Sequence, residues 1–439
     1  MPSRRNFLLA AGAGGAATLA LASTLRAHSE AAQENVETPR SAKARSPSIA
    51  GLKSMRGLAK PITLDERHAR IEKARRLMLE NHLDALLLMG GTSLDYFSNI
   101  HWYGDERLFA LILPSKGAPF YVCPAFERDR AAEQIAQSPL ADNPDVRVWE
   151  EDESPYAFVA QGLRDRGISS GRLGMEESVR YVFSDGIAHA APALKVVSGT
   201  PVTAGCRMYK SDHEIDLMRL AAQVTITAYE AAWRALRPGM THRQFQQLIN
   251  DAYDQLGFPG EVSVNVGRYS SLPHGSIAPQ QIREGEIVMI DDGCEVEGYG
   301  SDITRTFVLG KPSDKLRQVF EIVHSAQKAA LGAARPGVVA EAVDAAARKV
   351  ITDAGYGPGY KYFKHRVGHG MGMDGHEWPY LVKGDKTPLA PNMMFSDEPG
   401  IYIPGEFGVR LEDDMHITEN GAELFTGQSA SLEEPFAKG

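Results

Sequence analysis

Residues 398–412 read Glu398-Pro-Gly-Ile-Tyr-Ile-Pro-Gly-Glu-Phe-Gly-Val-Arg-Leu-Glu412, and they constrain the fold more than any other part of the chain. The central Pro-Gly-Glu predicts a tight turn between two short apolar strands. In that hairpin Ile403 faces Phe407. The same register, carried outward, places Glu398 opposite Glu412 on the sheet.

A second acidic hairpin is predicted upstream. Ile287-Val-Met-Ile-Asp291 is an apolar strand that runs directly into a carboxylate, although carboxylates are rare inside strands. A turn near Glu297-Gly298 is expected to bring Asp302 beside Asp291, give or take a bulge. Each hairpin therefore pairs two acids, and like charges that abut on a half-buried sheet need a compensating cation.

Histidines lie between and before the two hairpins. One segment reads His365-Arg-Val-Gly-His369-Gly-Met-Gly-Met-Asp-Gly-His376-Glu377, and His274 stands in a separate turn. The glycines let the backbone approach closely, and no amphipathic pattern accounts for the histidines. Taken singly, each acid has an ordinary explanation as a solvated carboxylate, and each histidine as a structural residue.

Taken jointly, four carboxylates and a histidine make a hard, mostly oxygen ligand set. Such a set suits two adjacent divalent ions bridged by acids. Two ions of this kind can share a hydroxide, lower its pKa toward neutrality and polarise a carbonyl. The expected metals are manganese, cobalt, zinc or iron, because a thiolate site is not indicated.

Residues from about 205 to 428 resemble the pita-bread metallopeptidases, the family of methionine aminopeptidase, aminopeptidase P and prolidase. The matching pieces are Asp291-x-Gly, Asp302-Ile-Thr-Arg-Thr, Gly-His369-Gly, Glu398-Pro-Gly and Arg410-x-Glu412-Asp. Residues 63–204 look like the N-terminal domain shared by prolidase, aminopeptidase P and creatinase. The resemblance implies an α/β N-terminal domain followed by an α+β pita-bread catalytic domain with an internal pseudo-two-fold duplication.

The sequence itself indicates this duplication. Pro238 and Gly257 begin and end one helical segment, and Pro336 and Gly355 do the same 98 residues later. Two matches at one offset are typical of similar halves packed about a pseudo-two-fold axis. The alternative stays open at this point, because Pro-Gly turns and helix-ending glycines are common in any fold.

The resemblance also implies residue roles. Five side chains would hold two divalent ions, with manganese the first choice: Asp291, Asp302, His369, Glu398 and Glu412. Asp302 and Glu412 would bridge both ions, and Glu398 would also be the general base or proton shuttle. Other side chains would contact the substrate, line its pocket or support the ligands: His274, His376, His365, Arg410, Thr304, Trp378 and Tyr380.

The implied reaction is hydrolysis of the bond before proline, at peptide N-termini or in dipeptides. Some prolidases read His-Glu-Trp-Pro-Arg where this chain reads His376-Glu-Trp-Pro-Tyr380. That arginine is assigned to the free carboxylate of a dipeptide, and a tyrosine cannot replace a bidentate guanidinium. The departure argues against a strict dipeptidase and leaves aminopeptidase P-like cleavage of longer peptides, or of another amide, open.

Two further functions are kept as alternatives. The scaffold also hydrolyses other C–N bonds, as in creatinase or ectoine-type hydrolases, although creatinase lacks the metal ligands found here. A non-enzymatic peptide-binding module is the third reading. It is disfavoured because every ligand position is filled.

The N-terminus is interpreted as a targeting signal. Residues 1–27 combine Arg4-Arg5 with a short apolar run, which resembles a twin-arginine export signal and predicts a periplasmic or secreted enzyme with no stable membrane association after cleavage. Residues 28–61 contain no aromatic residue and are predicted to be a flexible linker. Two domains are expected to follow, at 62–204 and 205–439.

Composition limits the partners. The 439-residue chain has 47 Lys+Arg against 56 Asp+Glu and no basic block, so nucleic acid is not an expected partner. Because related enzymes assemble as dimers or tetramers, a homo-oligomer is expected.

Overall fold

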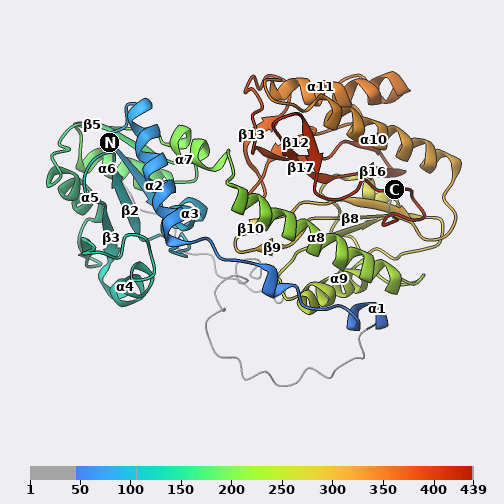
Figure 1. Ribbon diagram of the computed structural model, residues 1–439, viewed down its shortest axis with the longest axis horizontal. Helices are drawn as coiled ribbons and strands as arrows, with labels where there is room; N and C mark the ends of the chain where they lie inside the picture. The colour runs from blue at the N-terminus through green and yellow to red at the C-terminus, as the bar shows by residue number, and fades with distance from the viewer. Residues whose placement is uncertain (1–45, 105, 438–439) are drawn as a thin grey trace, which may run out of the picture. The chain divides into compact units, whose positions relative to one another are not determined.

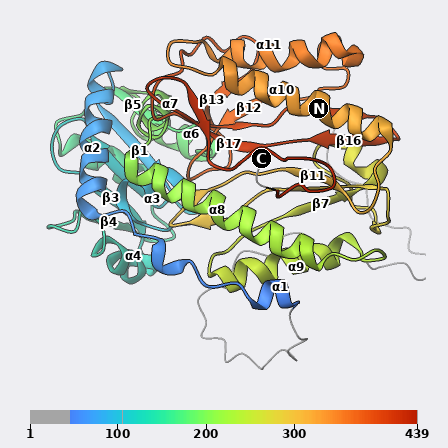
Figure 2. The ribbon, with the colours of Figure 1, turned by 45° about the vertical axis from the view of Figure 1, so that its right-hand side comes forward.

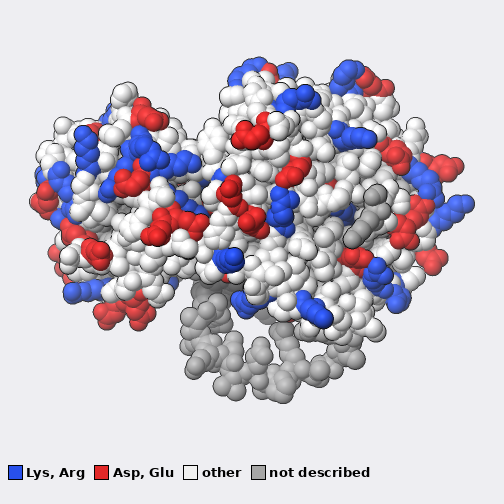
Figure 3. Space-filling view, viewed as in Figure 1, with Lys and Arg blue, Asp and Glu red and all other residues white. Residues whose placement is uncertain are grey.

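The computed structural model describes residues 46–104 and 106–437 (Figure 1). The predicted export signal, residues 1–27, lies outside the described residues, as does the part of the predicted linker before Ser46. In the part of the chain that is described, no helix is both long enough and apolar enough to cross a membrane. The face seen in Figure 3 carries acidic and basic side chains interspersed.

The N-terminal part is an α/β domain built on one six-stranded sheet of order β4-β3-β2-β1-β5-β6. Its strands are β1 (Ala85–Met89), β2 (Ala110–Pro114), β3 (Phe120–Pro124), β4 (Val146–Trp149), β5 (Gly171–Met175) and β6 (Leu194–Ser198). Its helices are α2 (Leu64–Glu80), α3 (Thr92–Ser98), α4 (Arg128–Ile135), α5 (Pro155–Arg164), α6 (Tyr181–Ala190) and α7 (Thr200–Arg207). Strands β1 to β3 are buried along their whole length, which explains their unbroken apolar sequences.

The C-terminal domain, for which the sequence predicts the catalytic role, consists of two similar halves. The first half contains α8 (Asp212–Ala235), α9 (His242–Leu256), β7 (Ser263–Val266), β8 (Ile287–Asp291), β9 (Glu295–Val296), β10 (Tyr299–Gly300) and β11 (Arg305–Val308). The second contains α10 (Asp314–Ala333), α11 (Ala340–Ile351), β12 (Gly368–Gly370), β13 (Glu377–Leu381), β14 (Met394–Asp397), β15 (Gly400–Ile403), β16 (Phe407–Arg410), β17 (Asp413–Ile417) and β18 (Ala422–Leu424). In Figure 2 the strands lie between the pair α8 and α9 and the pair α10 and α11.

Equivalent hydrogen bonds in the two halves confirm the predicted duplication. Before α9, the amide of Gly239 donates to the carbonyl of Ile282 at 2.9 Å. Before α11, the amide of Gly337 donates to the carbonyl of Leu389 at 2.8 Å. The two glycines are 98 residues apart in the sequence and both have a positive φ, 87° and 84°. The Pro-Gly turns therefore make the equivalent backbone hydrogen bond in each half.

Residues 46–61 differ from the flexible linker predicted for 28–61. They include the short helix α1 (Pro47–Ala50) and a 3-10 turn at Arg56–Leu58. Ile49 is fully buried in the core formed around α8 and α9. The composition of this segment could not support a core of its own, but it docks on the core of the catalytic domain, so the prediction is wrong here.

We expect Ile49→Ala to lower the free energy of unfolding by about 2 kcal/mol, the lower end of the range for removing a buried isoleucine side chain. The matched control is Leu58→Ala in the same segment, because Leu58 is 62% exposed. That control should change stability by less than about 0.5 kcal/mol. Chemical denaturation followed by fluorescence measures both, and equal effects would contradict the docked arrangement.

Candidate metal centre

The first acidic hairpin forms with a register that differs from the predicted one. Its turn lies at Glu297-Gly298, as expected, and both residues have a positive φ. Strand β8 pairs with β11 so that Ile290 is opposite Arg305. Continuing this register places Thr304 opposite Asp291, and the Thr304 hydroxyl contacts the Asp291 carboxylate. Asp302 instead enters the site from the irregular segment between β10 and β11.

The second hairpin has the predicted register. Ile403 pairs with Phe407 in β15 and β16, and Asp397 pairs with Asp413 in β14 and β17. The two ladders continue one register, so Glu398 and Glu412 lie opposite each other at the junction between them. Because a tight turn fixes the pairing of the strands that it joins, the short distance to the turn made this register predictable.

The five predicted ligands line one cavity of about 180 Å³. Its walls are formed by Pro273, His274, Asp291, Asp292, Asp302, His365, Arg366, His369, His376, Glu398, Arg410 and Glu412. One ligand atom from each of Asp302, His369 and Glu412 lies within 4.8 Å of the other two. His369 Nε2 is also 3.5 Å from Glu398 Oε1. The two halves of the catalytic domain both contribute to this cluster.

The acids of the cavity repel one another. Burial, followed by the charges of Asp291 and Glu398, raises the pKa of Asp302 well above its usual value. Burial and the charges of Asp302 and Glu398 do the same for Glu412. Burial also raises the pKa of Glu398 to about 7. This donor set of crowded oxygens and one imidazole therefore fits divalent cations, which would compensate the charge that the protein itself leaves uncompensated.

Arg410 and Thr304 contact two of these acids, Asp291 and Glu412. Burial alone would raise the pKa of Asp291, but the guanidinium of Arg410 and the Thr304 hydroxyl outweigh it and lower that pKa. Arg410 Nε donates to Thr304 Oγ1 at 2.9 Å, and Thr304 Oγ1 lies 2.6 Å from Glu412 Oε2. One arginine and one hydroxyl thus link acids from both hairpins, as expected for residues that support the ligands.

The histidines lie around the acids. The ring of His376 is 3.8 Å from that of His369, centroid to centroid. His365 Nε2 lies 2.7 Å from the hydroxyl of Tyr402, and burial together with the charge of Arg410 lowers the pKa of His365 to about 3. His365 is therefore neutral at physiological pH. His274 is exposed and lines the cavity from the loop before β8.

Trp378 does not lie where the sequence suggested. The rings of Trp378 and Tyr380 lie side by side on β13, with their centroids 4.5 Å apart. Trp378 lines a neighbouring pocket with Glu176 and Arg207 and donates from Nε1 to Glu177 at 3.1 Å. Tyr380 does not line the acidic cavity. Its ring contacts Arg366, and Arg366 does line that cavity.

Three residues of the site were not identified from the sequence. Asp292 lines the cavity, and burial with the charge of Asp291 raises its pKa to about 7. Tyr402 joins His365 to Arg410, whose Nη1 donates to the Tyr402 hydroxyl at 2.9 Å. Arg366 also lines the cavity. The only available signal was position, since each lies within four residues of a predicted ligand or pocket histidine.

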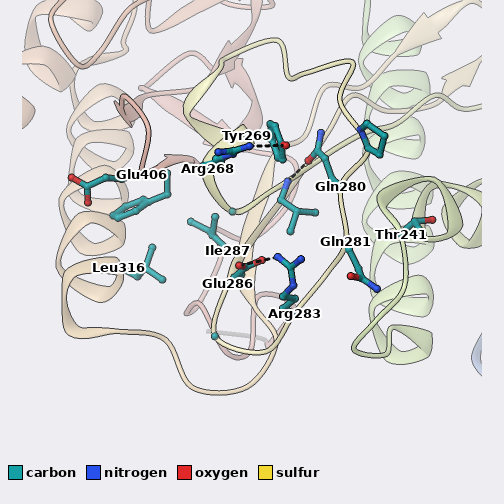
Figure 4. Close-up of a pocket in the computed structure, with 15 residues that line it drawn as sticks. Thr241, Arg268, Tyr269, Gln280, Gln281, Arg283, Glu286, Ile287, Leu316 and Glu406 are labelled. Carbon is teal, nitrogen blue, oxygen red and sulfur yellow. Dashed lines mark hydrogen bonds and ion pairs between the residues drawn. The ribbon is translucent and has the colours of Figure 1, made fainter.

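A larger cavity, of about 800 Å³, lies elsewhere on the catalytic domain (Figure 4). Its charged side chains are paired with neighbours: Arg283 with Glu286 at 3.4 Å, and Arg268 with the Tyr269 hydroxyl at 3.2 Å. None of its lining residues is a histidine or an aspartate. Its chemistry therefore gives no reason to place catalysis there.

Two family models match the chain. Residues 216–419 match the model "Metallopeptidase family M24", and residues 70–209 match "Creatinase/Prolidase N-terminal domain". A protein named Xaa-Pro dipeptidase from Lactobacillus delbrueckii subsp. lactis is 33% identical over 370 residues, which are 82% of this chain and 98% of that protein. A probable dipeptidase PepE from Mycobacterium tuberculosis is 36% identical over 363 residues, covering 80% of this chain and 93% of the other.

Solved structures give the same result. The dipeptidase PepE from Mycobacterium ulcerans superposes with a TM-score of 0.79 at 34% identity, over 85% of this chain and 99% of that one. A recombinant prolidase from Thermococcus sibiricus superposes with a TM-score of 0.75 at 30% identity, over 84% and 98% of the two chains. Both matches extend over nearly the whole of the known structures.

Proposed function

Because the chain belongs to metallopeptidase family M24, we propose that it hydrolyses the Xaa-Pro peptide bond with two divalent metal ions, manganese foremost. The observation that carries this proposal is the convergence of Asp302, His369 and Glu412 within 4.8 Å, in a cavity that Asp291 and Glu398 also line. The names of the similar proteins, Xaa-Pro dipeptidase and prolidase, supply the substrate class.

The five ligands would hold the ions between the two hairpins. When bound, the ions would supply a Lewis acid for the scissile carbonyl and lower the pKa of the attacking water. Glu398, 3.5 Å from His369 and 3.6 Å from His365, is placed to accept a proton from that water and to return it to the proline nitrogen as the bond breaks. His376 and His274 line the same cavity and would donate hydrogen bonds to the developing oxyanion.

The export signal predicted at residues 1–27 supports a periplasmic or secreted location. The twin-arginine route carries folded proteins, which suits an enzyme that binds its metal before export. We also propose a homo-oligomer, on the resemblance to related dimers and tetramers. Fractionation of the full chain tests the location, and light scattering of the purified enzyme tests the assembly.

Metal removal should abolish activity. We expect the chelated, dialysed protein to lose at least about 99% of its activity on Ala-Pro, because the proposed reaction needs a metal-activated water, and manganese should restore it. Elemental analysis should find two ions per chain in the restored enzyme. The substrate panel contains Ala-Pro, Gly-Pro-Ala, Ala-Ala and creatine. Full activity of metal-free protein would contradict the metal proposal, and turnover of creatine alone would favour the other C–N hydrolase.

A further inference from the structure

Among the described residues, Arg366 has no acid in ion-pair contact, although it lies beside an acid-rich site. Other arginines near the cavity are paired: Arg410 with Asp291, Arg348 with Asp344 at 2.8 Å, and Arg305 with Asp413 at 2.6 Å. For Arg366, no carboxylate oxygen of the described residues lies within the 4.0 Å of an ion pair, although Arg366 lines the cavity. The charge of Arg366 acts on Glu398 at longer range, but a guanidinium with no acid in close contact is available to bind a negative group of a ligand.

The surroundings of Arg366 hold its guanidinium in place without using most of its donors. The guanidinium carbon lies 4.0 Å from the centroid of the Tyr380 ring. Nη2 is 3.3 Å from His376 Nδ1. Contact of the guanidinium with the Tyr380 ring does not use up its N–H groups, and the N–H groups of a guanidinium recognise a carboxylate through two parallel hydrogen bonds.

The position of Arg366 fits the short distance between the scissile bond and the free carboxylate in a dipeptide. In Xaa-Pro the free carboxylate is separated from the scissile nitrogen by two covalent bonds, about 3 Å in all. A cation that pairs with this carboxylate must therefore lie at the edge of the cavity that holds the scissile bond. Arg366 lies there, next to His376, whose ring is 3.8 Å from that of His369.

We propose that Arg366, stacked on Tyr380, binds the free carboxylate of an Xaa-Pro dipeptide and makes the enzyme a dipeptidase. This inference rests on the proposed function and names its preferred substrate. Tyr380 then positions the cation and does not itself bind the carboxylate. The departure at position 380 in the sequence is compensated by an arginine from the neighbouring segment.

The test compares Ala-Pro with Ala-Pro amide, in which a neutral amide replaces the negatively charged carboxylate. Wild type should cleave the dipeptide with the higher kcat/KM. In Arg366→Gln, the ratio of kcat/KM for the dipeptide to that for the amide should fall about ten- to hundredfold, mainly through KM, because a charge-assisted contact is lost. Arg366→Lys should keep part of the ratio. Tyr380→Ala should reduce it, because the stacking partner is removed.

The control is Lys364→Gln, which removes a positive charge from the same segment. Lys364 is exposed, its Nζ lies 3.3 Å from the Ser271 carbonyl, and it is not part of the cavity wall, so the ratio should stay unchanged. The proposal is overturned if Arg366→Gln and wild type show the same ratio, or if wild type prefers the amide. A wild type that cleaves no proline peptide would instead overturn the proposed function, and this proposal with it.

Discussion

Asp302→Asn is expected to lower kcat/KM for Ala-Pro by about a thousandfold or more and to lower the bound metal at the same time. Asp302 belongs to the cluster whose ligand atoms lie within 4.8 Å of one another, and asparagine has nearly the same shape but a neutral side chain. The backbone amide of Asp302, which donates to Asp414 Oδ1 at 3.0 Å, is unaffected. The fold should therefore be retained.

Metal-free protein separates this effect from misfolding. Because Asp302 is repelled by Asp291 and Glu398 when no cation is bound, metal-free Asp302→Asn should unfold at the same temperature as metal-free wild type or above it. The matched control is Asp254→Asn on the exposed side of α9, which should keep activity and metal. Normal activity and metal content in Asp302→Asn would rule out the assigned ligand.

Glu377→Gln is expected to cost about 3–5 kcal/mol of unfolding free energy, because it leaves a buried ammonium without its counter-charge. Lys210 Nζ lies 3.1 Å from Glu377 Oε2, and the Lys210 side chain is only 2% exposed. Arg207 also pairs with Glu377 and keeps Asp374 as a second partner. Urea denaturation at pH 7 measures the loss. Glu72→Gln, in a largely exposed pair with Arg75, should cost at most about 1 kcal/mol.

The stability that the Glu377 ion pairs provide is expected to decrease at low pH. Burial alone would raise the pKa of Glu377, but Lys210 and Arg207 outweigh it and lower that pKa to about 2. A lowered carboxyl pKa gives stability that is present above the usual value of 4.5 and lost as the pH falls toward about 2. The gap between wild type and Glu377→Gln should therefore shrink below pH 4.5. A gap that is constant or grows on acidification would contradict the buried ion pair.

The parts of the fold that the sequence predicted are those set by local rules. Unbroken apolar runs form the buried strands β1 and β3, and Thr63 and Glu66 form a capping box at the start of α2. The opposition of Glu398 and Glu412 followed from a turn a few residues away. By contrast, Asp302 is separated from its strand by irregular backbone, so its register could not be extended from the turn.

The parts that were missed depend on tertiary contacts. Residues 46–61 look disordered until the core around α8 and α9 receives Ile49. Trp378 lies within the motif but lines another pocket, at the point where a register shift interrupts the pairing of β12 with β13. Arg366 carries no distinguishing sequence signal. Its significance comes from the absence of an acid in ion-pair contact among the described residues around it, which only the folded structure reveals.

The proposed ligands are divided between the two repeats. Asp291 and Asp302 come from one repeat, and His369, Glu398 and Glu412 come from the other. Neither repeat holds all five proposed ligands, so the proposed reaction would take place at the junction between the repeats, as it would at the symmetric contact of two identical subunits. The chain joins the two repeats covalently, and they differ at this junction: one contributes aspartates and the other an imidazole and glutamates.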